Sequence, residues 1–265
     1  MSIGVLVDTT KCIGCRSCQV ACKAWNDKPS EDTTCLGSYE NPPQLSAKTL
    51  TKVKYTELEV GDNLKWVMHK VQCMHCKDPA CVSVCPVEAL HKTDLGPVIY
   101  EEGNCIGCRY CMMACPFNVP KIDWDSLFPQ ISKCTLCFDR ISNGEQPACV
   151  KSCPTGAIKF GDRIELLGEA KSRIKNYAGR YVEHVYGEKE VGGTSWLYLS
   201  PVPFEKLGFP TLGPEPITKT AEDFARIGIP TASVVLAALS GGLYWLFRRR
   251  EILAKTKVSI ERDEE

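Results

Sequence analysis

The residues most able to do chemistry in this sequence are its cysteines. Sixteen of the seventeen form four compact groups of four, and Cys35 stands apart. The first and third groups share the spacing C-x2-C-x2-C-x3-C, the second widens its middle gap to four residues, and the fourth widens it to eleven. Thiolates clustered at such spacings are metal ligands. In chain order the groups are Cys12, Cys15, Cys18 and Cys22; Cys73, Cys76, Cys81 and Cys85; Cys105, Cys108, Cys111 and Cys115; and Cys134, Cys137, Cys149 and Cys153.

The spacing is that of bacterial ferredoxins. A C-x2-C-x2-C loop can wrap three corners of a 4Fe-4S cubane, and the fourth cysteine, on the helix that follows, ligates a second cluster. A proline after the last cysteine of the second, third and fourth groups fits the same pattern. Disulfides are disfavoured because the spacings are short and overlapping and residues 1–11 hold no secretory signal. Structural zinc needs two separated pairs of cysteines, which only the fourth group offers. We therefore predict four 4Fe-4S clusters.

The composition of the chain limits the kinds of protein and partner that these sites could serve. The chain has 265 residues, of which 44% are hydrophobic and 24% charged, so it can build a core of one or two domains. Lys+Arg 32 balances Asp+Glu 32, which leaves no basic field and argues against nucleic acid as a partner. Four oxidised clusters with their thiolates would add about eight negative charges. Most of the basic side chains beside the ligands are expected to be solvated: Lys11, Arg16, Lys23, Lys77, Arg109, Lys133 and Lys151.

The predicted fold is α+β, with two ferredoxin-like modules of two clusters each in residues 1–200. Residues 23–72 separate the first two cysteine groups and are predicted to be an insertion. Its proline-rich part, 26–44, indicates a loop, and the β-rich runs 51–60 and 64–71 indicate a hairpin. Cys35 lies in the loop and is not among the predicted ligands. His75, inside C-M-H-C, is either a hydrogen-bond donor near a sulfur or an ordinary loop histidine.

The C-terminal third carries a different pattern. Apolar residues at helical spacing predict an amphipathic helix over 163–181, and five prolines in 201–226 indicate a stiff connector. Residues 227–247 hold 21 uncharged residues, which span about 31 Å as a helix and match the hydrocarbon core of a bilayer. Tyr244 and Trp245 are suited to anchor this predicted transmembrane helix at one interface. The charged residues 248–265 form a tail.

Charge counting predicts the orientation of that helix. Six Lys or Arg follow it and only two lie in its nearer N-terminal flank, so the tail is expected in the cytoplasm and the cluster domain on the periplasmic or outer face of the inner membrane. Without a signal in residues 1–11, this requires export of the folded chain with a partner that carries one; otherwise the domain is cytoplasmic. Ser233, Ala237 and Gly241 form a stripe of small residues that would let a partner helix approach closely.

The cysteine motifs resemble those of a known family. The runs T-K-C-I-G-C-R-S-C-Q-V-A-C, N-C-I-G-C-R-Y-C-M-M-A-C-P and P-A-C-V-K-S-C-P-T-G-A-I-K-F-G are similar to those of the four-cluster iron–sulfur subunits of the DMSO reductase superfamily. V-G-G-T and the C-terminal helix are most similar to the beta subunit of membrane-bound respiratory formate dehydrogenase. The resemblance covers roughly residues 10–200 and, by position and character, the tail. Subunits of membrane-bound hydrogenases share nearly all of these motifs.

The spacing alone leaves the pairing of the groups open, and the resemblance implies it: the first group pairs with the fourth and the second with the third. Some relatives lack the second cysteine of the third group and hold a three-iron cluster there, whereas Cys108 is present in this chain. The implied ligand sets are Cys12, Cys15, Cys18 and Cys153 for cluster 1; Cys22, Cys134, Cys137 and Cys149 for cluster 2; Cys73, Cys76, Cys81 and Cys115 for cluster 3; and Cys85, Cys105, Cys108 and Cys111 for cluster 4.

The resemblance also implies a function. The chain would be a non-catalytic subunit that conducts electrons between a large molybdenum or tungsten pterin subunit, which oxidises formate, and a membrane cytochrome b subunit that reduces quinone. The first module would face the catalytic subunit and the second the membrane. An equivalent hydrogenase subunit and a free polyferredoxin carrier are the alternatives. An enzyme in its own right is disfavoured because the sequence has no nucleotide fingerprint or nucleophile motif.

Overall fold

The computed structural model describes residues 2–34, 37–61, 63–124, 127 and 129–263, without the side chains of residue 60 and residues 254–263. Cys35 lies outside the described residues. The chain divides into two compact units, Met1–Pro216 and Ile217–Glu265. All four cysteine groups belong to the first unit, so that unit carries the candidate sites.

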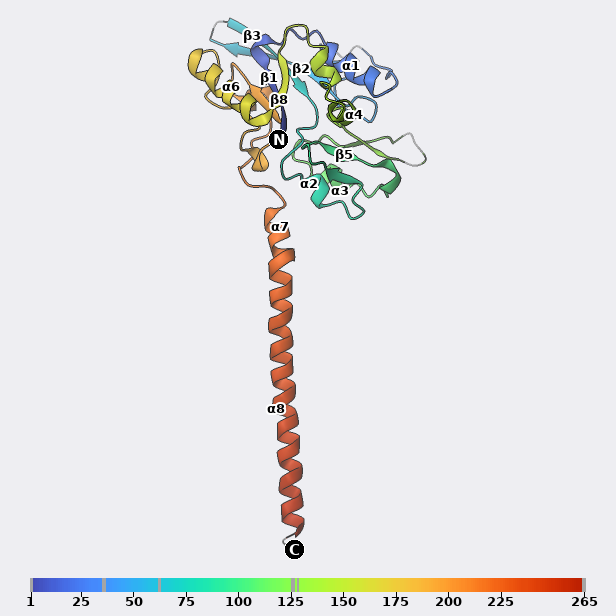
Figure 1. Ribbon diagram of the computed structural model, residues 1–265, viewed down its shortest axis with the longest axis vertical. Helices are drawn as coiled ribbons and strands as arrows, with labels where there is room; N and C mark the ends of the chain where they lie inside the picture. The colour runs from blue at the N-terminus through green and yellow to red at the C-terminus, as the bar shows by residue number, and fades with distance from the viewer. Residues whose placement is uncertain (1, 35–36, 62, 125–126, 128, 264–265) are drawn as a thin grey trace. The chain divides into compact units, whose positions relative to one another are not determined.

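The first unit is organised around a three-stranded sheet in the order β8, β1, β9. The central strand β1 (Ile3–Asp8) pairs antiparallel with β8 (Ile158–Asp162) and parallel with β9 (Trp196–Leu199). A central strand is covered on both faces, which explains the continuous apolar run of β1. Helix α6 (Arg163–Asn176) packs against β1, where Leu166 and Ala170 meet Leu6 (Figure 1). This sheet fixes the segments on either side of the first and fourth cysteine groups.

Two pairs of short strands frame the second and third groups. Strands β4 (Leu90–Lys92) and β5 (Val98–Tyr100) pair antiparallel, as do β6 (Lys121–Ile122) and β7 (Ile131–Ser132). The short helices α2 (Ala80–Ser83) and α3 (Tyr110–Ala114) pack together and lie near β5 (Figure 1). The first unit is therefore mixed α+β, as predicted.

The loops that carry the first and third groups are built alike. A 3-10 turn precedes each one, η1 (Thr9–Lys11) before Cys12 and η2 (Glu102–Asn104) before Cys105. An arginine in the left-handed conformation then begins each following helix: Arg16 (φ 60) before α1 (Ser17–Trp25) and Arg109 (φ 68) before α3. The repeated C-x2-C-x2-C-x3-C spacing thus folds into a repeated turn, loop and helix.

The fourth group is carried by α4 (Phe138–Ser142) and α5 (Ala148–Lys151), and α5 packs against α1 of the first group. Strands β2 (Lys52–Val60) and β3 (Asn63–Val71) pair antiparallel along their whole length, from Lys52 opposite Val71 to Val60 opposite Asn63. The two β-rich runs expected from the sequence are therefore paired strands. That residues 23–72 are an insertion into a ferredoxin module stays a prediction.

Two boundaries differ from those expected. Helix α6 ends at Asn176, not near residue 181, because Tyr177 leaves the helical conformation (φ -123, ψ 61). Residues 201–216, expected to be part of a connector, belong to the first unit, where the short turns η3 (Glu190–Gly192) and η4 (Phe204–Leu207) lie. Phe204 and Leu207 are buried in its core, at 2% and 0% exposure. Burial of these two apolar side chains holds the proline-rich segment against the rest of the first unit.

The second unit is helical. Helix α7 (Lys219–Asp223), the π-helical turn η5 (Phe224–Gly228) and α8 (Ile229–Asp263) follow one another without interruption (Figure 1). By length and composition, the helical stretch Lys219–Leu253 is apolar enough to cross a membrane, and none of its most apolar window is buried within the protein. The predicted segment 227–247 lies inside this stretch.

Candidate iron–sulfur cluster sites

The sheet register brings the first and fourth cysteine groups together. Val7 pairs with Ile158 at one end of the β1–β8 ladder, so the chain leaving β1 and the chain entering β8 lie side by side there. The loop of Cys12 follows β1 directly, and Cys153 precedes β8 directly. A cavity at this place is lined by Cys12, Cys15, Cys18 and Cys153 and by apolar side chains that include Val7 and Val53.

The same arrangement occurs between the second and third groups. Strand β4 pairs with β5 so that Leu90 is opposite Tyr100, which places the chain before β4 beside the chain after β5. Cys85 and Cys105 occupy those two positions. A second cavity here is lined by Cys85, Cys105, Cys108 and Cys111 together with apolar residues such as Leu90 and Ile131. Both cavities thus gather four cysteines in an apolar setting, which fits a 4Fe-4S cluster held by thiolates.

The remaining cysteines form two further sets. The four sets are numbered like the predicted clusters: set 1 is Cys12, Cys15, Cys18 and Cys153; set 2 is Cys22, Cys134, Cys137 and Cys149; set 3 is Cys73, Cys76, Cys81 and Cys115; and set 4 is Cys85, Cys105, Cys108 and Cys111. Burial raises the pKa of the Cys22 thiol to about 12, with Cys149 and Cys137 as neighbouring thiols that act in the same direction. Burial likewise raises the pKa of the Cys81 thiol to about 12, with Cys73 and Cys115 beside it. Thiols with such raised pKa values stay protonated in neutral solution, and binding to iron is what makes buried thiolates stable.

Three apolar clusters connect the four sets in a row. Cys18 of set 1 packs in the same core cluster as Cys149 of set 2. Cys134 of set 2 packs with Cys73 and Cys115 of set 3, around Val119. Cys81 of set 3 belongs to the cluster that contains Cys85, Cys105 and Cys111 of set 4. The antiparallel β6–β7 pair makes the middle connection, because β6 follows Cys115 and β7 precedes Cys134.

The cysteine loops direct backbone amides at sulfur. Gly107 N donates to Cys105 Sγ at 3.4 Å, and Leu136 N donates to Cys134 Sγ at 3.3 Å. Positive φ angles at Gly107 (69°) and Leu136 (59°) turn these loops sharply. Hydrogen bonds from amides stabilise sulfur that carries negative charge, so the loops are prepared for thiolate ligands.

The first and last sets are the ones that reach the surface. Cys15 of set 1 and Cys108 of set 4 are exposed, whereas the cysteines of sets 2 and 3 are buried or half-buried. Beside them, Ile13 is 60% exposed and Ile106 is 65% exposed. Sets 1 and 4 are therefore the two sets that have an exposed ligand.

Four of the seven basic residues beside the ligands are exposed, as expected for most of them, and two are half-buried, but Lys133 is buried. It is only 4% exposed, and its ammonium donates to the carbonyl oxygens of Val98 and Cys134. A second buried lysine, Lys70, lies on β3 among the cysteines and was not predicted. Strand alternation does not predict its burial, because the adjacent residues His69 and Lys70, which point to opposite faces of β3, are both buried.

His75 is not an ordinary loop residue, since it is fully buried. Its Nδ1 accepts a hydrogen bond from Val98 N at 3.0 Å, and its Nε2 has no partner among the residues that the structure describes. Burial holds the pKa of this imidazole well below its usual range, so the ring is neutral with its proton on Nε2. An unpaired buried donor between Cys73 and Cys76 in sequence is consistent with a sulfur acceptor nearby.

Single-ion sites differ from this arrangement. In a tetrahedral zinc site with Zn–S bonds of about 2.3 Å, the ligand sulfurs come within about 4 Å of one another. Within the described part of the chain, no three His, Cys, Asp or Glu side chains are placed to hold a single metal ion.

Repeated cysteine loops on an α+β scaffold define a ferredoxin-type protein with two dicluster modules. Two models of a 4Fe-4S dicluster domain match the chain, one over residues 11–89 and one over residues 64–163. Each family model matches one continuous stretch of the sequence. In the fold, by contrast, the β1–β8 register brings the first cysteine group next to the fourth. Two dicluster domains and sixteen grouped cysteines fit four 4Fe-4S clusters.

Comparison with known proteins shows which family of this class the chain belongs to. The iron–sulfur subunit of the nitrate-inducible formate dehydrogenase of Escherichia coli (strain K12) is 45% identical over 200 residues, 74% of this chain and 67% of that protein. The formate dehydrogenase-O iron–sulfur subunit of the same organism is 40% identical over 242 residues, 89% of this chain and 79% of that protein. The hydrogenase-2 operon protein HybA of Escherichia coli O157:H7 is 37% identical over 271 residues, 91% and 82% respectively. The chain belongs to the iron–sulfur subunit family that includes these formate dehydrogenase subunits.

Proposed function

We propose that this chain is a four-cluster electron conductor of a membrane-bound oxidoreductase of the formate dehydrogenase type. It would connect a molybdenum or tungsten pterin subunit, which oxidises formate, to a cytochrome b subunit in the membrane that reduces quinone. The observation that carries the proposal is the row of four cysteine sets joined by three shared apolar clusters. Clusters held in such a row allow an electron to step from each one to the next.

The two cavities and the two sets between them support a ligand assignment. Sets 1 and 4 line cavities of their own, and sets 2 and 3 lie between them. We assign the clusters in this order along the row: cluster 1 to Cys12, Cys15, Cys18 and Cys153; cluster 2 to Cys22, Cys134, Cys137 and Cys149; cluster 3 to Cys73, Cys76, Cys81 and Cys115; and cluster 4 to Cys85, Cys105, Cys108 and Cys111.

The role is conduction and not catalysis in this chain. A bound 4Fe-4S cluster supplies one-electron transfer, and the protein supplies its position and its electrostatic surroundings. Each cavity is lined mainly by cysteines and apolar side chains, with Arg16, Lys70 and Thr155 beside them in the first and Tyr100 and Arg109 in the second, and this lining fits a cluster with negatively charged ligands. The exposed ligands Cys15 and Cys108 give clusters 1 and 4 the access that two different partner subunits need.

The C-terminal helix supports a membrane location. Ser233 Oγ donates to Ile229 O and Ser240 Oγ donates to Leu236 O, each at 2.8 Å, so both hydroxyls are satisfied within the helix. Satisfied hydroxyls are tolerated in hydrocarbon, where no water is available to pair with them. We place this helix across the inner membrane with the tail in the cytoplasm and the cluster domain on the periplasmic side.

A hydrogenase-type complex is the second candidate. The observation in its favour is that the similarity to HybA covers 91% of this chain, about as much as the 89% covered by the formate dehydrogenase-O subunit. The electron path would be the same, with hydrogen in place of formate as the donor. A free polyferredoxin would have no use for the apolar helical stretch Lys219–Leu253.

Purification of the chain from detergent-extracted membranes under anaerobic conditions tests the proposal. The expected preparation contains about sixteen irons per chain, a cubane EPR spectrum on reduction, and a molybdenum or tungsten pterin subunit together with a cytochrome. Formate reduction of the clusters would favour the first candidate and hydrogen reduction the second. A folded, water-soluble chain with far fewer irons and no partners would contradict both.

A further inference from the structure

A buried lysine lies where the charges of two clusters would meet. Lys70 is 3% exposed, and its Nζ donates to Thr51 Oγ1 and, at 3.1 Å, to Gln72 Oε1. The ammonium also lies 4.8 Å from the centroid of the Trp196 ring. In the described part of the chain, none of the ion pairs involves Lys70. Its positive charge is therefore buried without a carboxylate.

The position of this lysine is fixed by the sheet. Tyr198 OH donates to the carbonyl oxygen of Lys70 at 2.9 Å, which ties β3 to β9. Gln72 Nε2 donates to the same Tyr198 hydroxyl at 2.6 Å. Trp196 and Tyr198 are both buried, at 0% and 1% exposure. The ammonium thus has little freedom to move toward solvent.

The groups that Lys70 faces are cysteines of the first module. It lines the cavity formed by Cys12, Cys15, Cys18 and Cys153, which we assign to cluster 1. Burial lowers the pKa of the Lys70 ammonium, but the neighbouring thiols of Cys149, Cys18, Cys134 and Cys22 raise it, so that the pKa lies above its usual range. Of these four residues, Cys18 belongs to set 1 and the other three to set 2. The lysine therefore acts on both clusters of the module.

Burial of an unpaired ammonium is strongly unfavourable unless an anion compensates for it. Each oxidised cubane with four thiolates carries about two negative charges, and one-electron reduction adds another. A fixed positive charge in a low-dielectric interior stabilises the reduced cluster more than the oxidised one, because the attraction grows with the negative charge. The effect on a cluster is a higher midpoint potential.

We propose that Lys70 sets the reduction potentials of clusters 1 and 2, raising both together through its buried positive charge. The inference rests on the proposed function and deepens it, because it names a residue outside the ligand sets that controls the path. Raising both potentials together keeps the two clusters of the module matched, so that the step between them is not strongly uphill in either direction. Lys65 lies on the same strand but is exposed, so its charge does not act on the clusters of the first module in this way.

The test compares Lys70→Met with Lys70→Arg and with Lys65→Met in the complete complex. EPR-monitored redox titration at one pH gives the midpoint potentials of the four clusters. In K70M, two clusters should become harder to reduce by at least tenfold in the reduction equilibrium constant, about 59 mV for one electron. K70R should retain the wild-type potentials to within a smaller shift, since the charge is kept. K65M removes the same formal charge from the same strand and should leave all four unchanged.

A fully loaded K70M complex with unchanged midpoint potentials would overturn the inference, as would an equal shift in all four clusters or equal shifts in K70M and K70R. If K70M fails to load its clusters, Lys70→Gln replaces it in the same redox titration, because glutamine is also neutral but keeps a hydrogen-bonding group toward Thr51 and Gln72. If both neutral variants lack clusters while K70R is loaded, Lys70 serves assembly and the potential-setting role is wrong. Failure of the proposed function would look different, because the wild-type complex would then lack cubane signals.

Discussion

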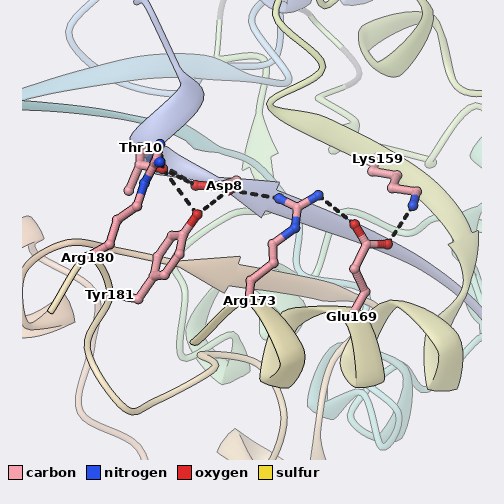
Figure 2. A network of polar contacts seen from close by, with 7 residues as sticks. All are labelled: Asp8, Thr10, Lys159, Glu169, Arg173, Arg180 and Tyr181. Atoms are coloured by element: carbon pink, nitrogen blue, oxygen red, sulfur yellow. Dashed lines mark hydrogen bonds and ion pairs between the residues drawn. The ribbon is translucent and has the colours of Figure 1, made fainter. Parts of the chain in front are cut away.

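Arg173 Nη1 lies 2.8 Å from Asp8 Oδ2, joining helix α6 to the residue that ends β1 (Figure 2). Asp8 is 1% exposed and also accepts hydrogen bonds from Tyr181 OH at 2.9 Å and from Thr10 Oγ1 at 2.6 Å. The turn that leads to Cys12 begins at the next residue. This buried carboxylate therefore holds the entrance to the first cysteine loop against α6.

Asp8→Asn should destabilise the domain and its first cluster. The substitution removes the charged acceptor of the Arg173–Asp8 contact while Glu169 still pairs with Arg173, and loss of one charge-assisted hydrogen bond costs about 1.5–3 kcal/mol in the free energy of unfolding. The loss should appear in chemical denaturation under anaerobic conditions, with cluster 1 released at lower denaturant concentration than in the wild type.

Lys159→Gln is the matched control for this network. Lys159 also belongs to it through Glu169, but its side chain is 54% exposed, and exposed pairs contribute less than about 1 kcal/mol. K159Q should therefore unfold almost like the wild type. Equal stability of D8N and K159Q would show that the Asp8–Arg173 contact does not support the loop.

Cys153→Ser should damage one cluster only, and that cluster should be the one held by the first group. Cys153 is far from Cys12 in sequence but lines the same cavity. Loss of one thiolate ligand should lower the iron content by about one to four atoms and change the EPR signals of cluster 1 alone. Cys35→Ser is the control and should retain all the iron, since Cys35 is not in a group. Loss of signals from the second module in C153S would contradict the pairing.

Two cysteines should be the first to react when the clusters are damaged by an oxidant. Cys15 and Cys108 are exposed, whereas Cys134 and Cys149 are buried. In the isolated chain, alkylation with iodoacetamide during mild oxidation should label Cys15 and Cys108 first, as peptide mass spectrometry would show. In the complete complex, both sites should be protected by the subunits docked at the two ends of the row. Equal labelling with and without partners would argue against docking at those ends.

Gly241→Leu should weaken the association of the C-terminal helix with a membrane subunit. An added side chain at Gly241 meets nothing within the chain itself, so any clash it causes must come from a partner. Loss of close helix packing is expected to cost about 1 kcal/mol, or roughly fivefold in affinity. Co-purification in mild detergent measures this loss. Val235→Leu, on a different face of the helix, is the control and should leave the complex intact. If the complex is intact in both variants, the helix anchors the chain in the membrane without packing against a partner helix at Gly241.

Local patterns in the sequence predicted much of the site. The cysteine spacings, the runs of β2 and β3 and the uncharged stretch 227–247 are local features, and a local pattern can be read without knowing the fold. The pairing of groups is not local, because it depends on the register of β1 with β8 and of β4 with β5. The buried lysines escaped prediction for a similar reason. The ammonium of Lys70 donates to Thr51 Oγ1 and that of Lys133 donates to Val98 O, and these acceptors lie 19 and 35 residues away in the sequence.

Gly14→Ala should disturb the first cysteine loop more than Gly107→Ala disturbs the third. Both glycines have the left-handed conformation, with φ of 67° and 69°, so alanine pays about 1–2 kcal/mol of backbone strain at either position. A Cβ at Gly14 would lie 2.7 Å from Cε1 of Tyr55, but at Gly107 its nearest neighbour would be the carbonyl oxygen of Pro129 at 3.5 Å.

The Tyr55 ring must therefore move in G14A, and with it the hydroxyl that donates to Gly14 O and accepts from Arg16 Nε. We expect G14A to lose stability beyond the backbone term and to shift the EPR signal of cluster 1, while G107A shows the backbone cost alone. Thermal unfolding and EPR of the two variants measure both effects. Equal losses in G14A and G107A would mean that the contact between β2 and the first loop contributes nothing to holding the ligands.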